Sequence, residues 1–190
     1  PEHGEAGPSG EDAGFGGNRS YTDLRRMPWS EAHRIYVYES DLIARISSAE
    51  DPDDEYFVVE DELYEDPEGI LGLDIGVASA VVALSAARCI PFSSCNAGAF
   101  GGDHHETYPL VAFYARPAHA PLLIKYATRT DCGLENGSRG CVVLYAANVE
   151  NIRKFAAEVI SQSREFRKLD LSTPRNLEQP SEGTRQLKLL

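Results

Sequence analysis

The chain has 190 residues, of which 42% are hydrophobic and 25% are charged, a composition typical of a globular protein with one sizeable core. Its net charge of −12 is concentrated in one acidic segment, and a nearly neutral body with such a segment argues against general binding to the phosphate backbone of nucleic acids. The apolar runs fall well short of the about 20 residues that cross a bilayer, and the opening residues lack a secretory-signal pattern, so we expect neither membrane insertion nor secretion.

The N-terminal part predicts a tail followed by a strand and a short helix. Residues 1–20 are rich in Gly, Pro, Glu and Ser, which favours a disordered segment. The β-branched and aromatic run 33–38 predicts a first strand. Ser40 and Asp41 then offer an N-cap for a short helix that continues to about residue 46.

An acidic segment follows, which begins at Glu50 and ends at Glu68. It holds eleven carboxylates and no Lys or Arg, and so accounts for all but one of the net negative charges. Within it, residues 56–59 predict an edge strand that the flanking carboxylates protect from pairing with other chains. The segment is either a solvated acidic loop or a docking patch for a basic protein partner, because concentrated charge speeds association with an oppositely charged surface.

The middle of the chain predicts a buried helix between strands. Asp74 is placed to cap a helix over residues 75–88, whose small and apolar residues predict burial on all sides. Residues 90–94 read as a short core strand, and the continuous apolar run 109–115 as a strand covered on both faces. Pro117 can open the helix that comes next.

The C-terminal part continues with a turn, a strand and a long amphipathic helix. Residues 131–140 are rich in turn residues, and 141–146 predict another buried strand. Asn148 is expected to cap the clearest helix, whose apolar residues recur at helical spacing. Residues 171–190 are polar and predict a second tail.

This order of elements predicts one α/β (or α+β) domain over residues 21–170. We expect a mixed sheet of about four to six strands with helices packed on it. Strand 109–115, helix 117–129 and strand 141–147 together have the length of a right-handed βαβ crossover, which would span residues 109–147.

Chemically able side chains are concentrated between residues 89 and 106 as nowhere else in the chain. Cys95 would close strand 90–94, and a glycine-rich turn separates it from His104, His105 and Glu106. If one imidazole folded back onto the thiol, it could take the proton, and Glu106 could orient the ring, as in cysteine-nucleophile hydrolases and transferases. The alternative is a buried, inert thiol with both histidines on the surface.

Further polar groups near Cys95 could bind a small polar or anionic ligand. Donors to an oxyanion or phosphate could come from an amide, two hydroxyls and glycine backbone N–H groups. Arg116 follows strand 109–115 and is expected on the same rim as Cys95, where it could bind an anion. The candidate ligand-binding residues are Ser93, Ser94, Asn96, Gly98, Gly101, Gly102 and Arg116. The glycine spacing matches neither a P-loop nor a dinucleotide fingerprint, so neither ATP nor NAD is predicted.

Zinc is the weaker alternative for the same residues, and we predict no cofactor. Cys95, His104, His105 and Glu106 are all competent zinc ligands. Adjacent residues of a strand point to opposite faces, however, so the two histidines would not bind one ion together, and the usual two-cysteine spacing is absent. Four cysteines are too few for a disulfide scaffold, which favours a reducing, cytoplasmic environment. Cys132 and Cys141 could form a disulfide, but two packing residues are favoured, and His119 is expected to be a surface or capping residue.

Two classes of function remain. The first is a small-molecule-binding or thiol-dependent enzyme domain with its site on the loop from Cys95 to Glu106. The second is an intracellular protein-binding module, such as an inhibitor, an immunity protein or an adaptor, which docks a basic partner through residues 50–68. We favour the first, because charge runs are common in proteins and such a cluster of reactive side chains is not.

Overall fold

A computed structural model describes residues 24–66, 69–101, 106–137 and 140–171. These residues form one mixed α/β domain with six α-helices and a four-stranded sheet, which confirms the predicted fold class at the low end of the expected strand number. The helices are α1 (Trp29–Ser48), α2 (Pro52–Glu65), α3 (Ala78–Ala86), α4 (Ala120–Arg129), α5 (Val149–Ser161) and α6 (Ser163–Arg167), with a 3₁₀ turn η2 (Pro117–His119) before α4. The strands are β1 (Ile90–Cys95), β2 (Leu110–Tyr114), β3 (Cys132–Asn136) and β4 (Cys141–Ala146). The predicted tails lie outside the described residues, apart from Leu171.

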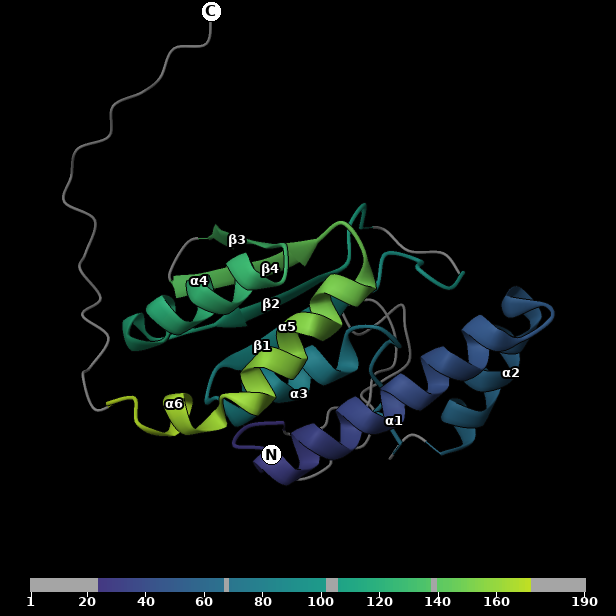
Figure 1. Ribbon diagram of the computed structural model, residues 1–190, viewed down its shortest axis with the longest axis horizontal. Coiled ribbons are helices and arrows are strands. Elements are labelled where there is room, and N and C mark those ends of the chain that lie inside the picture. The colour runs from purple at the N-terminus through teal and green to yellow at the C-terminus, as the bar shows by residue number, and fades with distance from the viewer. Residues whose placement is uncertain (1–23, 67–68, 102–105, 138–139, 172–190) are drawn as a thin grey trace, which may run out of the picture.

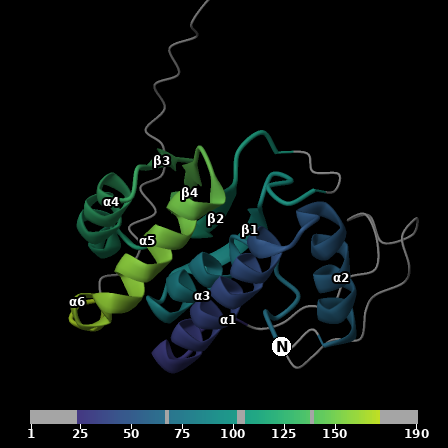
Figure 2. The same ribbon diagram turned by 45° about the vertical axis from the view of Figure 1, so that its right-hand side comes forward.

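The helices cover one face of the sheet in two layers (Figure 1). Helices α3, α4 and α5 contact the strands, and α1 packs on α3 and α5. Figure 2 shows α2 packed beside α1 at the edge of the helical layers. One apolar cluster fills the space between the sheet and α3, α4 and α5, and a second joins α1, α2 and α3. None of the described helices combines the length and the apolar composition of a membrane span.

The sheet has the order β1-β2-β4-β3, and each neighbouring pair in it is antiparallel. The expected parallel crossover from strand 109–115 to strand 141–147 is therefore wrong. Because β2 and β3 both run antiparallel to β4, they point the same way, with β4 inserted between them. The chain does cross over through α4, but it arrives at β3, which lies in the segment expected to be a turn, and a hairpin then brings β4 back beside β2.

Two expected strands are helical instead. Residues 33–38 lie inside α1, where Ile35, Leu42 and Ile46 are buried at helical spacing against the core. Residues 56–59 lie inside α2, whose N-terminus is capped by the Asp51 carboxylate, 3.2 Å from the backbone nitrogens of both Asp53 and Asp54. Tertiary packing and a capped, acidic first turn thus override the local β propensity.

Residues 52–65 of the acidic segment are consequently a helix rather than a loop. Its residues Phe57, Val58 and Tyr64 are exposed among carboxylates. Arg45 of α1 holds the helix in place through ion pairs with Glu55 and Glu62, each at 2.6 Å. That this surface docks a basic partner stays a prediction.

The other expected elements are present with small shifts. Strands 90–94, 109–115 and 141–146, the helix after Pro117 and the Asn148-capped helix are confirmed as elements, the last by a 3.0 Å bond from the Asn151 backbone N–H to Asn148 Oδ1. The expected core position of strand 90–94 is wrong, because Ile90 and Phe92 are 48% and 52% exposed at the edge of the sheet. All nine residues of α3 are buried, as expected.

The expected cap of α3 is wrong. The helix starts at Ala78, and the capping carboxylate is that of Glu39 from α1 instead of Asp74. Glu39 Oε1 accepts hydrogen bonds from the N–H groups of Gly76 at 2.8 Å and Ala78 at 2.9 Å, and Oε2 accepts one from Ser79 at 3.2 Å. A fully buried carboxylate thus satisfies the first N–H groups of a buried helix.

Candidate functional site

Cys95 ends β1 on the face of the sheet turned away from α3 and α5. It pairs with Leu110, which in turn pairs with Tyr145, whereas the neighbouring pair Val111 and Leu144 belongs to the buried core. The thiol is half-buried, and its sulfur accepts a hydrogen bond from the Ala97 N–H at 3.3 Å.

The expected partners of Cys95 are placed only in part. His104, His105 and Gly102 lie outside the described residues, and Glu106 is exposed, so the catalytic assignment stays a prediction. In the part of the chain that the structure describes, no three His, Cys, Asp or Glu residues gather closely enough to hold a metal ion. The four cysteines, all of them among the described residues, form no disulfide.

The side chain of Asn96 supports the loop itself. It is fully buried, with Nδ2 donating to the Ile75 carbonyl at 3.0 Å and Oδ1 accepting from the Gly98 N–H at 3.0 Å. Gly98 and Gly101 have φ values of +69° and +120°, which glycine adopts without strain. Ser93 is exposed and Ser94 is half-buried.

Arg116 does not lie on the rim of Cys95. Strand β1 runs antiparallel to β2, with Ile90 opposite Tyr114 and Cys95 opposite Leu110. The residue that follows β2 therefore lies at the other end of the sheet, beside the start of β1. The expectation of a shared rim assumed parallel strands, and that assumption is wrong here.

At that other end, Arg116 lines a cavity of about 1260 Å³ together with four more arginines. The cavity lies where the segment before α1, the α3–β1 connection, the start of η2 and the end of α6 meet. Its arginines, all exposed, are Arg25, Arg26, Arg88, Arg116 and Arg167. Asp170 is the one carboxylate among the described residues that line it. We call the five arginine side chains the arginine rim.

The floor of the cavity is apolar. Phe166, Ala87 and Cys89 are buried there, and Met27 and Trp29 are half-buried. Burial raises the pKa of the Cys89 thiol to about 12, so this group is neutral and inert at physiological pH.

Arg88 reaches the rim through the way in which α3 ends. Its φ of +67° is left-handed, and the Arg88 N–H bonds to the Ser85 carbonyl at 2.9 Å while the Cys89 N–H bonds to that of Leu84 at 3.0 Å. This is the Schellman pattern, in which glycine usually occupies the left-handed position. An arginine here accepts backbone strain and points a cation at the cavity.

His119 links the backbone segments that carry Arg88 and Arg116. The expected surface position is wrong, since the imidazole is fully buried, but it does cap the turn: Nδ1 accepts the Arg116 N–H at 3.0 Å. The other nitrogen, Nε2, donates to the carbonyl of Ala87 at 2.9 Å, so the ring is neutral with its proton on Nε2. Burial lowers the pKa of His119, and the charges of Arg116 and Arg88 lower it further. The ring thereby fixes the backbone at both arginines.

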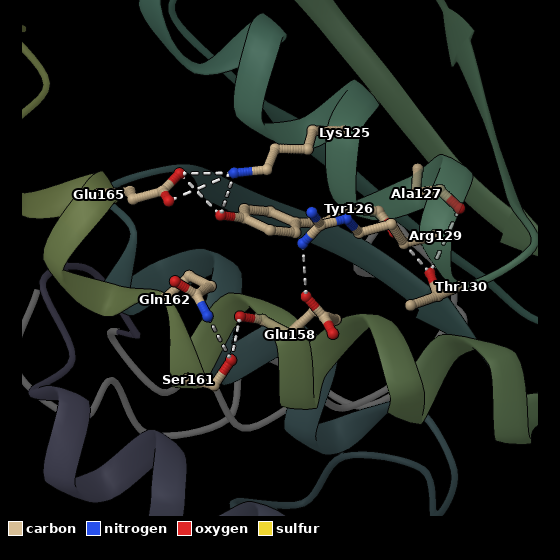
Figure 3. Close-up of polar contacts among 9 residues, drawn as sticks. All are labelled: Lys125, Tyr126, Ala127, Arg129, Thr130, Glu158, Ser161, Gln162 and Glu165. Carbon is tan, nitrogen blue, oxygen red and sulfur yellow. Dashed lines mark hydrogen bonds and ion pairs between the residues drawn. The ribbon is translucent and has the colours of Figure 1, made fainter.

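Polar contacts between α4 and α6 help to position Phe166 in the floor of the cavity. Figure 3 shows these contacts. Glu165 accepts a hydrogen bond from the Tyr126 hydroxyl at 2.8 Å and pairs with Lys125 at 3.1 Å. Phe166, the next residue, packs between Tyr126 and Trp29, with ring centroids 5.9 Å and 6.1 Å away. The position of Phe166 in the floor is thus fixed from both sides.

Of the rim, the sequence pointed only to Arg116. The other four arginines are spread from position 25 to position 167, and no local spacing links them. They share only their position: each lies near the end of a helix or strand, and these ends meet at the same end of the sheet. No protein-family model, curated protein or solved structure matches the chain.

Proposed function

We propose that this chain is a binding domain for a small anionic ligand, which it holds in the cavity beneath the arginine rim. The observation that carries this proposal is the grouping of five arginines around one cavity in a chain of net charge −12. Within the described residues, Arg26, Arg88, Arg116 and Arg167 have no carboxylate at ion-pair distance. Their donors are therefore available to a phosphate or carboxylate, with which arginine forms paired, charge-assisted hydrogen bonds.

The charge of the whole molecule does not oppose this site. The acidic helix α2 and helix α6 lie at opposite ends of the molecule (Figure 1). At physiological ionic strength, charges separated by more than about 8 Å are largely screened from one another. The anion therefore experiences mainly the rim and Asp170.

Calorimetric titration of inorganic phosphate into the full chain tests the proposal. Each hydrogen bond from a protein to a charged group contributes about 1.5–3 kcal/mol, so Arg88→Gln or Arg116→Gln should weaken binding by at least about tenfold. Arg164→Gln is the matched control, because it removes the same charge from the same helix as Arg167 but does not line the cavity. Equal affinities in all these variants would refute the site.

Thiol chemistry at Cys95 is a second candidate function, supported by the hydrogen bond from the Ala97 N–H to its sulfur. This donor fixes the orientation of the sulfur at the end of β1. Alkylation of the native protein at neutral pH, read out for each cysteine by mass spectrometry, tests it. Cys95 should be labelled much faster than Cys141, which is also half-buried. Equal, slow labelling of the two would remove the nucleophile assignment.

A further inference from the structure

We infer that the ligand of this cavity is an amphiphilic anion, that is, a phosphate or carboxylate group joined to an apolar body. The inference rests on the proposed function and specifies the class of ligand. It comes from the contrast between the rim of the cavity and its floor.

The rim and the floor have different chemistry. The five arginines of the rim are exposed, whereas the accessible apolar lining comes from the half-buried side chains of Met27, Trp29 and Leu169. In the floor, Trp29 packs against Phe166, with their rings tilted by 42° to each other. A free inorganic anion would contact the guanidinium groups and leave this apolar surface in contact with water.

The size of the cavity points the same way. Cavities that bind small organic molecules usually measure about 300–1,000 Å³, and this one is about 1260 Å³. That space far exceeds what a phosphate or carboxylate group alone occupies. An apolar body attached to the anion would occupy this space and cover the accessible parts of Met27, Trp29 and Leu169, which is favourable in proportion to the area covered.

Calorimetry with a series of probes on the full chain tests this inference. The probes are methyl phosphate, n-hexyl phosphate, phenyl phosphate, hexanoate and neutral hexanol. A fully buried methylene contributes about fourfold in affinity, so hexyl phosphate should bind at least about tenfold more tightly than methyl phosphate even if half-covered. Its binding should also show a more negative heat-capacity change, and hexanol should bind far more weakly than either.

Variants of the floor locate the apolar body. Met27→Gln and Leu169→Gln each place a polar group on the lining. Each should reduce the preference for hexyl over methyl phosphate at least threefold, and Arg164→Gln should leave this preference unchanged. Because the two residues lie on different segments, either folded variant suffices, and the comparison of probes on the unmodified chain needs no variant.

The outcomes separate this inference from the proposed function. If methyl and hexyl phosphate bind equally, the anion site stands and the amphiphilic ligand is refuted. If neither phosphate binds and hexanoate does not bind, both are refuted. Tighter binding of hexyl phosphate that is unchanged in both floor variants would place the apolar body elsewhere and overturn the inference. The hexanoate and phenyl phosphate titrations tell which anionic group and which apolar shape the cavity prefers.

Discussion

Replacement of Arg88 by glycine should stabilise the fold while it weakens anion binding. Arg88 occupies the left-handed position of the Schellman motif at φ +67°. This conformation costs a residue with a Cβ about 1–2 kcal/mol, and glycine pays no such penalty. Glycine also makes the unfolded chain more flexible, which offsets about 0.4–1 kcal/mol. The Arg88 side chain is exposed and makes no ion pair with the described residues, so little native contact is lost.

The expected net gain is therefore about 0.5–1 kcal/mol in the free energy of unfolding, or about 1–4 °C in the melting temperature. Urea unfolding followed by circular dichroism measures it, and phosphate titration of the same sample measures binding. Arg88→Ala is the matched control, since it also lacks the guanidinium but keeps the Cβ: it should bind phosphate as weakly as Arg88→Gly without the gain in stability. A glycine variant less stable than the alanine variant would refute the strained-cap reasoning.

Three further predictions concern Glu39, His119 and Cys95. In Glu39→Gln, an amide NH₂ would face the Ser79 N–H, so the free energy of unfolding measured in urea should fall by about 1–3 kcal/mol. An unchanged urea midpoint would contradict the capping role. Because the pKa of His119 is lowered in the folded state, the unfolded chain takes up the proton first; the stability that the neutral ring contributes is complete above about pH 6.5 and is lost as the pH falls below it. Unfolding free energies from pH 7.5 to 5 should therefore converge between wild type and His119→Gln, and parallel curves would count against this. Cys89 should resist alkylation in the native state and react only after unfolding, because burial raises its pKa to about 12; fast native labelling would show that this thiol is accessible to solvent.

The strands that the sequence predicts correctly are those with continuous apolar runs, such as 110–114 and 141–146. Strand β3 escaped prediction because Gly133 and its polar neighbours suggest a turn. The structure gives the glycine another reason: the ring of Tyr145 lies across it, and a Cβ at this position would come within 2.2 Å of Tyr145 Cζ. Close packing between strands therefore required the residue that, in the sequence, indicates a break.

The site could be predicted less well than the fold. A local cluster such as that around Cys95 is visible in the sequence, and Arg116 was expected to bind an anion. The remaining arginines meet only because β1 and β2 are antiparallel and α6 returns to the start of β1. Similarly, the cap of α3 comes from Glu39, which lies 39 positions before the helix starts at Ala78. Neither arrangement has a local sequence pattern.

The most direct test of the anion site is a titration with phenyl phosphate followed through the arginine Nε–Hε signals in nuclear magnetic resonance spectra. We predict saturable shifts of the signals of Arg88 and Arg116, with no change at Arg45, whose guanidinium is paired with Glu55 and Glu62 at the far end of the molecule. Shifts confined to backbone signals near Cys95, with Arg88 and Arg116 unchanged, would contradict the account.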